Sequence, residues 1–357
     1  MSSFFKHLGM VAFALLPILS SAALQTGKVQ VGKVSGTVTI IDAKAQRKPL
    51  ANGASFQEGS LVETGVNSTA ELVFSNGASV VLTPNTLLQL RTFRQVPSAG
   101  IIDPYRQIEK DPSPSVTELE VPRGKIIGEV RKLNSLSTFT VKTPAGLVRI
   151  RGTVFAIEYR ISADGIGRVV VDCVRGSVET TVYSSNAGPL NVEPGMKASS
   201  AVASAALINS LANATGAPNA AAPSAATLAV LSQPVKIMLH PIPAEDMAAI
   251  GALLSANSTL NVEVATTINA MAQTMPTRAQ IFPNGPGGAP NKDFVTSITN
   301  PLPADVIVTR VGQSGPNGPT NTTTGGSSSL DDTLKKITDN VDRTVEQKQI
   351  NPTPTGS

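Results

Sequence analysis

Between residues 24 and 200 the chain consists of short segments in which apolar, often β-branched, residues alternate with polar ones, such as "TVTIID", "AELVF" and "STFTVKT". Turns that contain Gly or Pro separate these segments. This spacing is typical of an all-β domain. A weak echo, "GKVSGTVTI", "RGKIIGEV" and "RGSVETTV", indicates similar hairpin units packed in succession. We therefore predict a mainly β fold of stacked short antiparallel strands, sandwich-like or solenoid-like, followed by an Ala/Pro/Gly-rich C-terminal region that is partly helical or disordered.

The segment "AELVFSNGASVVL" predicts a β-hairpin. A two-residue turn would place Phe74 opposite a serine. A three-residue loop that ends at Gly77 instead pairs apolar residues with one another: Ala70 with Leu82, Leu72 with Val80, and Phe74 with Ala78. We favour the second register, because Gly in the last loop position readily takes the left-handed conformation that such loops require.

The apolar pattern changes parity at Gly152. Val148 and Ile150 occupy even positions, whereas Phe155 and Ile157 occupy odd ones. A strand that changes parity turns its core face to water unless an extra residue is inserted in the ladder. We therefore interpret Gly152 as a β-bulge, where Gly tolerates the backbone angles and a β-branched residue would be strained.

The N-terminus has the features of a secretory signal peptide. Lys6 precedes an apolar run from Leu8 to Leu19, and small residues follow at Ala22 and Ala23. The run is shorter than the roughly 20 residues of a membrane-spanning helix. We predict a signal peptide over residues 1–23 and a periplasmic or secreted protein, with an uncleaved membrane anchor as the alternative.

The chain can be divided further by composition. The predicted β domain covers residues 24–200, and a stretch with four prolines interrupts it at 91–116 as a surface loop. The later segments are an Ala-rich linker at 201–233, a short helical segment at 234–280, a Gly/Pro/Ser/Thr-rich linker at 281–328, an amphipathic helix at 329–348 and a tail at 349–357. The amphipathic helix could dock on its own domain, self-associate or enter a partner's groove.

Ordered motifs in the β domain match a family pattern. An "EG-x-x-x-x-TG" element, "A-x-L-x-F-x-x-G" and a Pro-Asn turn occur in succession, followed by Thr143-Pro144 and Arg151-Gly152-Thr153-Val154-Phe155. In this order the motifs resemble the FecR domain, the periplasmic signalling domain of ferric-citrate-type iron sensors, over roughly Gly32 to Ala198. The resemblance implies a β-rich interaction module that binds another envelope component. It does not extend to the cytoplasmic sigma-regulating part or the membrane span of those sensors, so sigma-factor control is not carried over.

Basic residues concentrate around Gly152. Residues 123–160 hold eight basic and two acidic side chains, which gives a local charge of +6. We identify candidate partner-binding residues for an envelope protein or an anionic envelope polymer: Arg149, Arg151, Thr153, Lys142 and Arg131. The alternative is that these charges are the solvated face of a sheet. Thr143, Pro144, Gly152, Phe155 and Gly77 are candidate structural residues.

The chain offers little for catalysis or for cofactor binding. His7 belongs to the predicted signal peptide, which leaves His240, and no HExxH or CxxC spacing occurs. A hydrolase centred on His240 is a third hypothesis, against which stands the lack of a Gly-x-Ser-x-Gly elbow. The net charge of +4 is too small to indicate nucleic acid binding. The only cysteine, Cys173, is predicted to be buried and inert, with intermolecular pairing as the alternative.

We therefore expect an exported, non-catalytic interaction or signalling module without cofactor or metal. The alternative is a structural or adhesive surface protein that uses the β domain as a spacer or a polymer-binding module. The two hypotheses differ in whether the residues around Arg149 and Arg151 contact a partner.

Overall fold

The computed structural model describes residues 23–163, 165–183, 188–203, 235–257, 262–285 and 289–299 of the 357-residue chain. The predicted signal peptide up to residue 22, nearly all of the Ala-rich linker and the amphipathic helix at 329–348 lie outside the described residues. The assignments made for those segments stay predictions.

The fold is mainly β, as predicted. Two sheets share the long strand β10 (Ser115–Glu129), whose first half pairs in sheet A and whose second half pairs in sheet B. Sheet A has the order β4 (Arg47–Pro49), β3 (Val38–Ile41), β6 (Leu61–Thr64), β9 (Leu87–Gln95), β10, β11 (Thr138–Thr143), β12 (Gly146–Ile150), β15 (Val178–Val182), β16 (Leu190–Val192), with β1 (Gln25–Thr26) also on β9. Among the described strands, every pair is antiparallel except β10 with β11.

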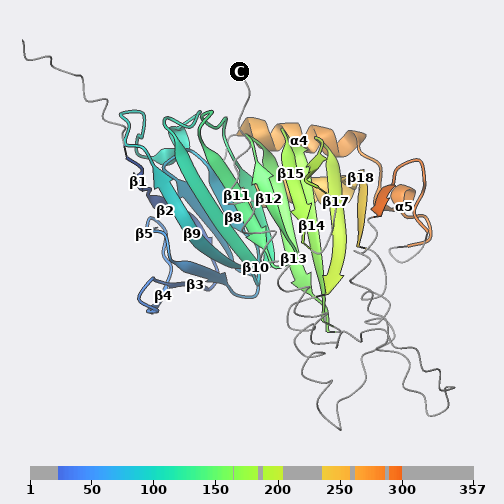
Figure 1. Cartoon of the computed structure of the whole chain (residues 1–357), viewed down its shortest axis with the longest axis horizontal. Coiled ribbons are helices and arrows are strands. Elements are labelled where there is room, and N and C mark those ends of the chain that lie inside the picture. Colours follow the sequence, from blue (N-terminus) through green and yellow to red (C-terminus); the bar gives the residue numbers. More distant parts are fainter. Residues whose placement is uncertain are drawn as a thin grey trace, which may run out of the picture.

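Sheet B continues through later parts of the chain. Its order is β5 (Ser55–Phe56), β2 (Val29–Ser35), β7 (Thr69–Phe74), β8 (Ser79–Leu82), β10, β13 (Val154–Ile161), β14 (Ile166–Arg175), β17 (Met196–Ala203), β18 (Lys236–Pro241), β19 (Thr296–Thr299). In Figure 1 these strands form a long succession from the blue N-terminal strands to yellow β17 and β18. The main core lies between the two sheets. It includes Val148 of β12 and Phe155 of β13, both fully buried.

The chain repeatedly crosses from one sheet to the other at residues with positive φ. Gly36, Gly152 and Gly176 each lie between a strand of one sheet and a strand of the other, and Gly124 lies where β10 changes sheets. The sequence echo marks these crossings, because Gly36, Gly124 and Gly176 occupy corresponding places in its three copies. The repeated unit is therefore a sheet crossing.

The bulge interpretation of Gly152 is wrong. β12 ends at Ile150 in sheet A and β13 begins at Val154 in sheet B, so no single ladder continues through Gly152. The parity changes because the core lies on the other side of the strand after the crossing. Gly152 itself has φ +67, which fits the expectation of a backbone angle that favours glycine.

The predicted hairpin register is confirmed. β7 and β8 pair Ala70 with Leu82 and Leu72 with Val80, and the Phe74 N–H donates to the Ala78 carbonyl. Gly77 has φ +85, as a three-residue loop of this kind requires.

The Pro-rich insertion is shorter and better packed than predicted. Strands β9 and β10 include the two ends of the predicted insertion, so the insertion itself covers residues 96–114. The 3-10 helix η1 (Tyr105–Gln107) lies within it, and Tyr105 and Ile108 pack on Val73 of β7. Apolar side chains thus fix this segment to sheet B instead of leaving it as a plain surface loop.

Helices cover the outer face of sheet B. The predicted helical segment contains α3 (Ala244–Asn257), α4 (Val262–Thr274) and α5 (Arg278–Ile281), and Figure 1 shows α4 in orange. Met247, Ile250 and Leu254 form an apolar stripe on α3 that packs against Ile127, Val154 and other outward-facing residues of sheet B. Strands β18 and β19 were not predicted. β18 precedes α3 and β19 follows α5 in the sequence, and both strands extend sheet B. Composition had assigned the first of these segments as helical and the second as linker.

Candidate functional site

The site is built around the crossing at Gly152, where three segments converge. The Arg151 N–H donates to the Ser177 carbonyl at 3.3 Å, which ties the corner to the turn between β14 and β15. The Val130 N–H donates to the Thr153 carbonyl at 2.8 Å, which ties it to the end of β10. These backbone hydrogen bonds fix the corner against both neighbouring segments.

A second crossing packs directly on the first. A Cβ atom added to Gly176 would lie 2.4 Å from the Gly152 carbonyl oxygen and 2.5 Å from Thr153 Cγ2. The same addition at Gly152 would meet nothing closer than Lys132 Cα at 3.5 Å. The close approach of the two crossings therefore depends on the missing side chain of Gly176.

A cleft of about 710 Å³ opens at this corner. Its walls are the end of β10, the loop of residues 130–137, the start of β11 and the crossing itself. The loop is anchored at both ends: the Asp111 N–H donates to the Lys132 carbonyl at 3.1 Å, and the Ser115 N–H donates to Ser137 Oγ at 2.8 Å. The cleft is thus bounded by hydrogen-bonded segments.

The cleft is electropositive. Five basic and two acidic side chains line it, which gives a local charge of +3: Arg131, Lys132, Arg149, Arg151 and Arg175 against Glu109 and Glu129. Arg149 forms an ion pair with Glu179 at 2.9 Å. Arg151 and Arg175 are exposed and form no ion pair with another residue that the structure describes. Two guanidinium groups are therefore available to a ligand at the rim.

The buried wall of the cleft contains polar atoms that lack hydrogen-bond partners. Glu129 Oε2, Arg131 Nε and Thr153 Oγ1 are all buried, and none has a partner within the described part of the chain. Arg131 Nε lies 3.5 Å from Glu129 Oε1, close enough for an ion pair but without hydrogen-bond geometry. Such groups are costly when buried and unpaired, so the wall of the cleft holds polar groups that a hydrogen-bonding ligand could satisfy.

Glu129 is the least exposed charged group of the cleft, at 3%. Burial raises the pKa of its carboxyl group, although the positive charges of Arg131 and Arg175 act in the opposite direction. The two guanidinium groups thus partly offset the cost of a carboxylate in this position.

The structure brings four of the five predicted contact residues to the cleft and leaves one elsewhere. Arg131, Arg149, Arg151 and Thr153 line it, but Thr153 is 2% exposed, so its side chain is part of the inner wall and not of an open surface. Lys142 lies outside the cleft and pairs with Glu118 at 2.7 Å.

Four charged residues of the cleft were missed as contact residues: Lys132, Arg175, Glu109 and Glu129. The sequence held a signal for Arg175, because Arg175-Gly176 repeats the Arg151-Gly152 pair of the motif. No pattern in the sequence marks Glu129 as buried.

The candidate structural residues have identifiable roles. Thr143 Oγ1 accepts the N–H groups of Ala145 and Gly146 and so closes the turn at Pro144 between β11 and β12. Phe155 is fully buried between the sheets, with its ring centroid 6.4 Å from that of Phe139. Hydrogen bonding thus accounts for the Thr position of the motif, and packing accounts for the Phe position.

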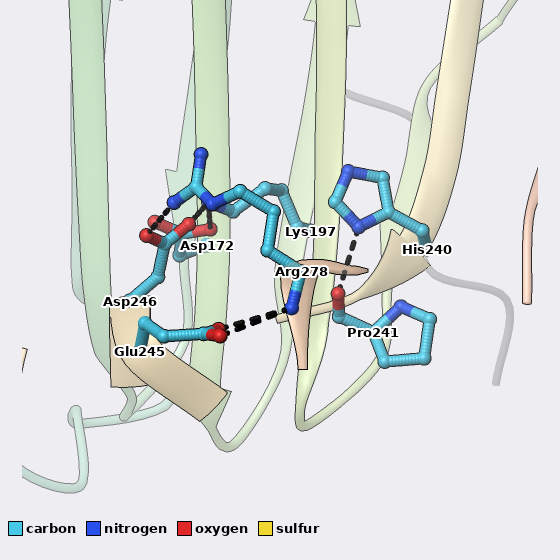
Figure 2. Close-up of polar contacts among 7 residues, drawn as sticks. All are labelled: Asp172, Lys197, His240, Pro241, Glu245, Asp246 and Arg278. Atoms are coloured by element: carbon cyan, nitrogen blue, oxygen red, sulfur yellow. Dashed lines mark hydrogen bonds and ion pairs between the residues drawn. The ribbon is translucent and has the colours of Figure 1, made fainter. Parts of the chain in front are cut away.

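A second polar cluster lies between sheet B and the helices, as Figure 2 shows. Asp172 of β14 is 2% exposed and lies 3.3 Å from Lys197 Nζ of β17. Lys197 also pairs with Asp246 of α3, and Asp246 pairs with Arg278 of α5. Burial raises the pKa of Asp172, and the positive charge of Lys197 opposes that shift. The cluster fastens α3 and α5 to the sheet.

His240 lies beside this cluster and is 4% exposed. Its Nδ1 lies 2.7 Å from the Pro241 carbonyl oxygen, and its ring packs edge-on against Phe282. Burial lowers the pKa of His240. These contacts give the residue a packing role where β18 leads into α3.

Cys173 is fully buried, and burial raises the pKa of its thiol to about 12, which agrees with the predicted inert cysteine. Within the ranges that the structure describes, no cluster of three His, Cys, Asp or Glu side chains could hold a metal ion. No helix in those same ranges has the length and apolar character needed to cross a membrane.

Comparison with known proteins agrees with the predicted resemblance. The family described as FecR protein matches residues 60–179, a range that contains the Gly152 corner and the whole cleft. Residues 60–179 therefore match the FecR family, as the order of the motifs predicted. A search of curated protein sequences finds no significant match.

Two solved structures of a candidate anti-sigma factor from Parabacteroides distasonis ATCC 8503 are similar to part of the chain. They are 14% and 15% identical, with TM-scores of 0.29 and 0.28. In both cases the similarity covers 39% of this chain and 53% of the other, so the chain spans about half the length of these structures.

Proposed function

We propose that this protein is an exported, non-catalytic signalling module whose FecR domain binds another component of the bacterial cell envelope through the basic cleft. The observation that carries this proposal is that one cleft combines buried polar atoms without hydrogen-bond partners and two exposed arginine side chains without an ion pair, both within the described residues. The FecR match supports the signalling role, and the sequence features of residues 1–23 support a periplasmic or secreted location.

The cleft is favoured over the rest of the basic surface for a physical reason. Lys142 and Arg149 have carboxylate partners, which neutralise them and hold their side chains in place. Arg151 and Arg175 form no ion pair with another described residue, although the charge of Arg175 acts on Glu129, so both exposed guanidinium groups can pair with a partner.

The test is crosslinking in envelope extract with the full chain and two charge-reversed variants. Arg151→Glu/Arg175→Glu changes the cleft. Arg160→Glu/Arg168→Glu makes the same change in charge at the opposite end of β13 and β14, where these two residues face each other. The proposal expects a crosslinked partner with the wild type and the control but not with the cleft variant, each checked for folding by circular dichroism. Equal crosslinking by both variants would show that the cleft is not the contact surface.

A further inference from the structure

We infer that the cleft binds an extended, acidic segment of polypeptide that carries at least one apolar side chain. This inference rests on the proposed function and specifies the class of ligand. Three features of the cleft support it, and each favours a different part of such a ligand: the charged rim, the polar inner wall and the apolar side chains of the loop.

The rim favours acidic side chains. Arg151, Arg175 and Lys132 are exposed at the mouth and give the cleft its excess of positive charge. Guanidinium groups form paired hydrogen bonds with carboxylates, so the two arginines are suited to aspartate or glutamate side chains on either side of the corner.

The inner wall favours a peptide backbone over a simple anion. Among the described residues, Glu129 Oε2 is an acceptor without a hydrogen-bond partner, and Arg131 Nε, which lies 3.5 Å from Glu129 Oε1 in an ion pair, is a donor without one; the Thr153 hydroxyl can donate or accept. A peptide unit supplies one N–H donor and one carbonyl acceptor, so it can satisfy groups of both kinds. An anionic polymer that offers only oxygen acceptors would leave Glu129 unpaired and would be repelled by it.

The loop favours an apolar side chain. Leu136 is 74% exposed, although it is a large aliphatic residue, and the half-buried Leu133 also lines the cleft. The aromatic ring that lines the cleft, Phe139, is 1% exposed and offers no stacking surface for a sugar. A leucine or similar side chain of the ligand would cover Leu136.

The direct test measures fluorescence anisotropy with a fluorescein-labelled decapeptide in which aspartate and leucine alternate. The full chain should bind this probe, and a matched peptide with asparagine in place of aspartate should bind roughly tenfold more weakly or worse. Arg151→Glu/Arg175→Glu should weaken binding roughly tenfold or more, while Arg160→Glu/Arg168→Glu should leave it unchanged.

Glu129→Gln distinguishes the ligand classes by the sign of its effect. If a peptide N–H donates to the carboxylate, loss of the charge should weaken binding by about fivefold. If the ligand is held only by its negative charge, removal of a negative charge from the cleft should strengthen binding. Leu136→Ser should also weaken binding of the peptide, by about fivefold.

Four results would overturn the inference. Three are no binding of the probe, tighter or unchanged binding by Glu129→Gln, and unchanged binding by Leu136→Ser. The fourth is displacement of the probe by alginate, an anionic polymer, at the same concentration of carboxylate groups as the probe. The crosslinking experiment separates this failure from failure of the proposed function. A partner that depends on Arg151 and Arg175 but is not mimicked by the peptide would leave the proposed function intact, whereas loss of both results would reject both.

Discussion

Replacement of Gly176 by alanine tests whether the contact between the two crossings holds the FecR domain together. Gly176 has φ +90, and an L-residue in this region costs about 1–2 kcal/mol. The new Cβ would also lie 2.4 Å from the Gly152 carbonyl oxygen and 3.0 Å from Thr153 Cα. These are backbone atoms that cannot move away without shifting the corner, and overpacking of this kind costs about 1–3 kcal/mol more. We therefore expect Gly176→Ala to lower the free energy of unfolding by about 2–5 kcal/mol.

Gly152→Ala is the matched control. It has the same type of backbone angle, φ +67, but its added Cβ would meet Lys132 Cα at 3.5 Å, which is ordinary contact. Only the backbone cost of about 1–2 kcal/mol is expected. The effect of alanine on the unfolded chain applies to both variants and therefore cancels in the comparison.

The measurement is urea unfolding followed by far-ultraviolet circular dichroism, since the chain has no tryptophan. The difference between the two variants should be about 1–3 kcal/mol, with Gly176→Ala the less stable. Equal free energies of unfolding would refute the reasoning, because they would mean that the contact between Gly176 and the Gly152 corner carries no packing constraint.

Two further predictions concern the cluster between sheet B and the helices. Lys197→Met leaves the buried Asp172 without its cation and should lower the free energy of unfolding by about 3–5 kcal/mol. Asp172→Asn in the same chain removes the unpaired charge and should restore much of this loss. A double variant that is no more stable in urea than Lys197→Met alone would contradict the prediction. Burial lowers the pKa of His240 in the folded protein below the ordinary value of 6.5. Above that pH the side chain is neutral in both states. As pH falls below it, the unfolded chain binds a proton that the folded chain does not, so the free energy of unfolding decreases. Between about pH 7 and about pH 5.5, the free energy of unfolding of His240→Gln, measured with urea, should therefore fall by less than that of the wild type. An equal fall in both proteins would count against the prediction.

Part of the fold follows from local sequence pattern. Alternation of apolar residues predicts strands because side chains on a strand point to opposite faces in turn, and the hairpin at Gly77 was predicted to the residue because one register alone pairs its apolar side chains. Part of the FecR motif order has a related reason: Gly59, Gly77, Asn85 and Gly152 have positive φ, a backbone angle that restricts the amino acid.

The same local rules failed at Gly152 because they assume one continuous sheet. A change of parity fits both a bulge and a crossing to a second sheet, and only the position of the second sheet distinguishes them. Strands β18 and β19 were missed for a similar reason. They are short and depend on pairing with strands that are distant in sequence, so their own residues carry a weak signal.

The candidate site shows the same division. The sequence by itself determined that basic residues gather around an Arg-Gly-Thr corner, because composition and motif order are local properties. Tertiary structure alone decided which of them are free: Glu118 and Glu179 neutralise Lys142 and Arg149 from other strands, whereas Arg175 reaches the cleft from a neighbouring crossing. The burial of Glu129 is likewise set by sheet packing, since the solvation of a carboxylate depends on what surrounds it in space and not on its neighbours in the chain.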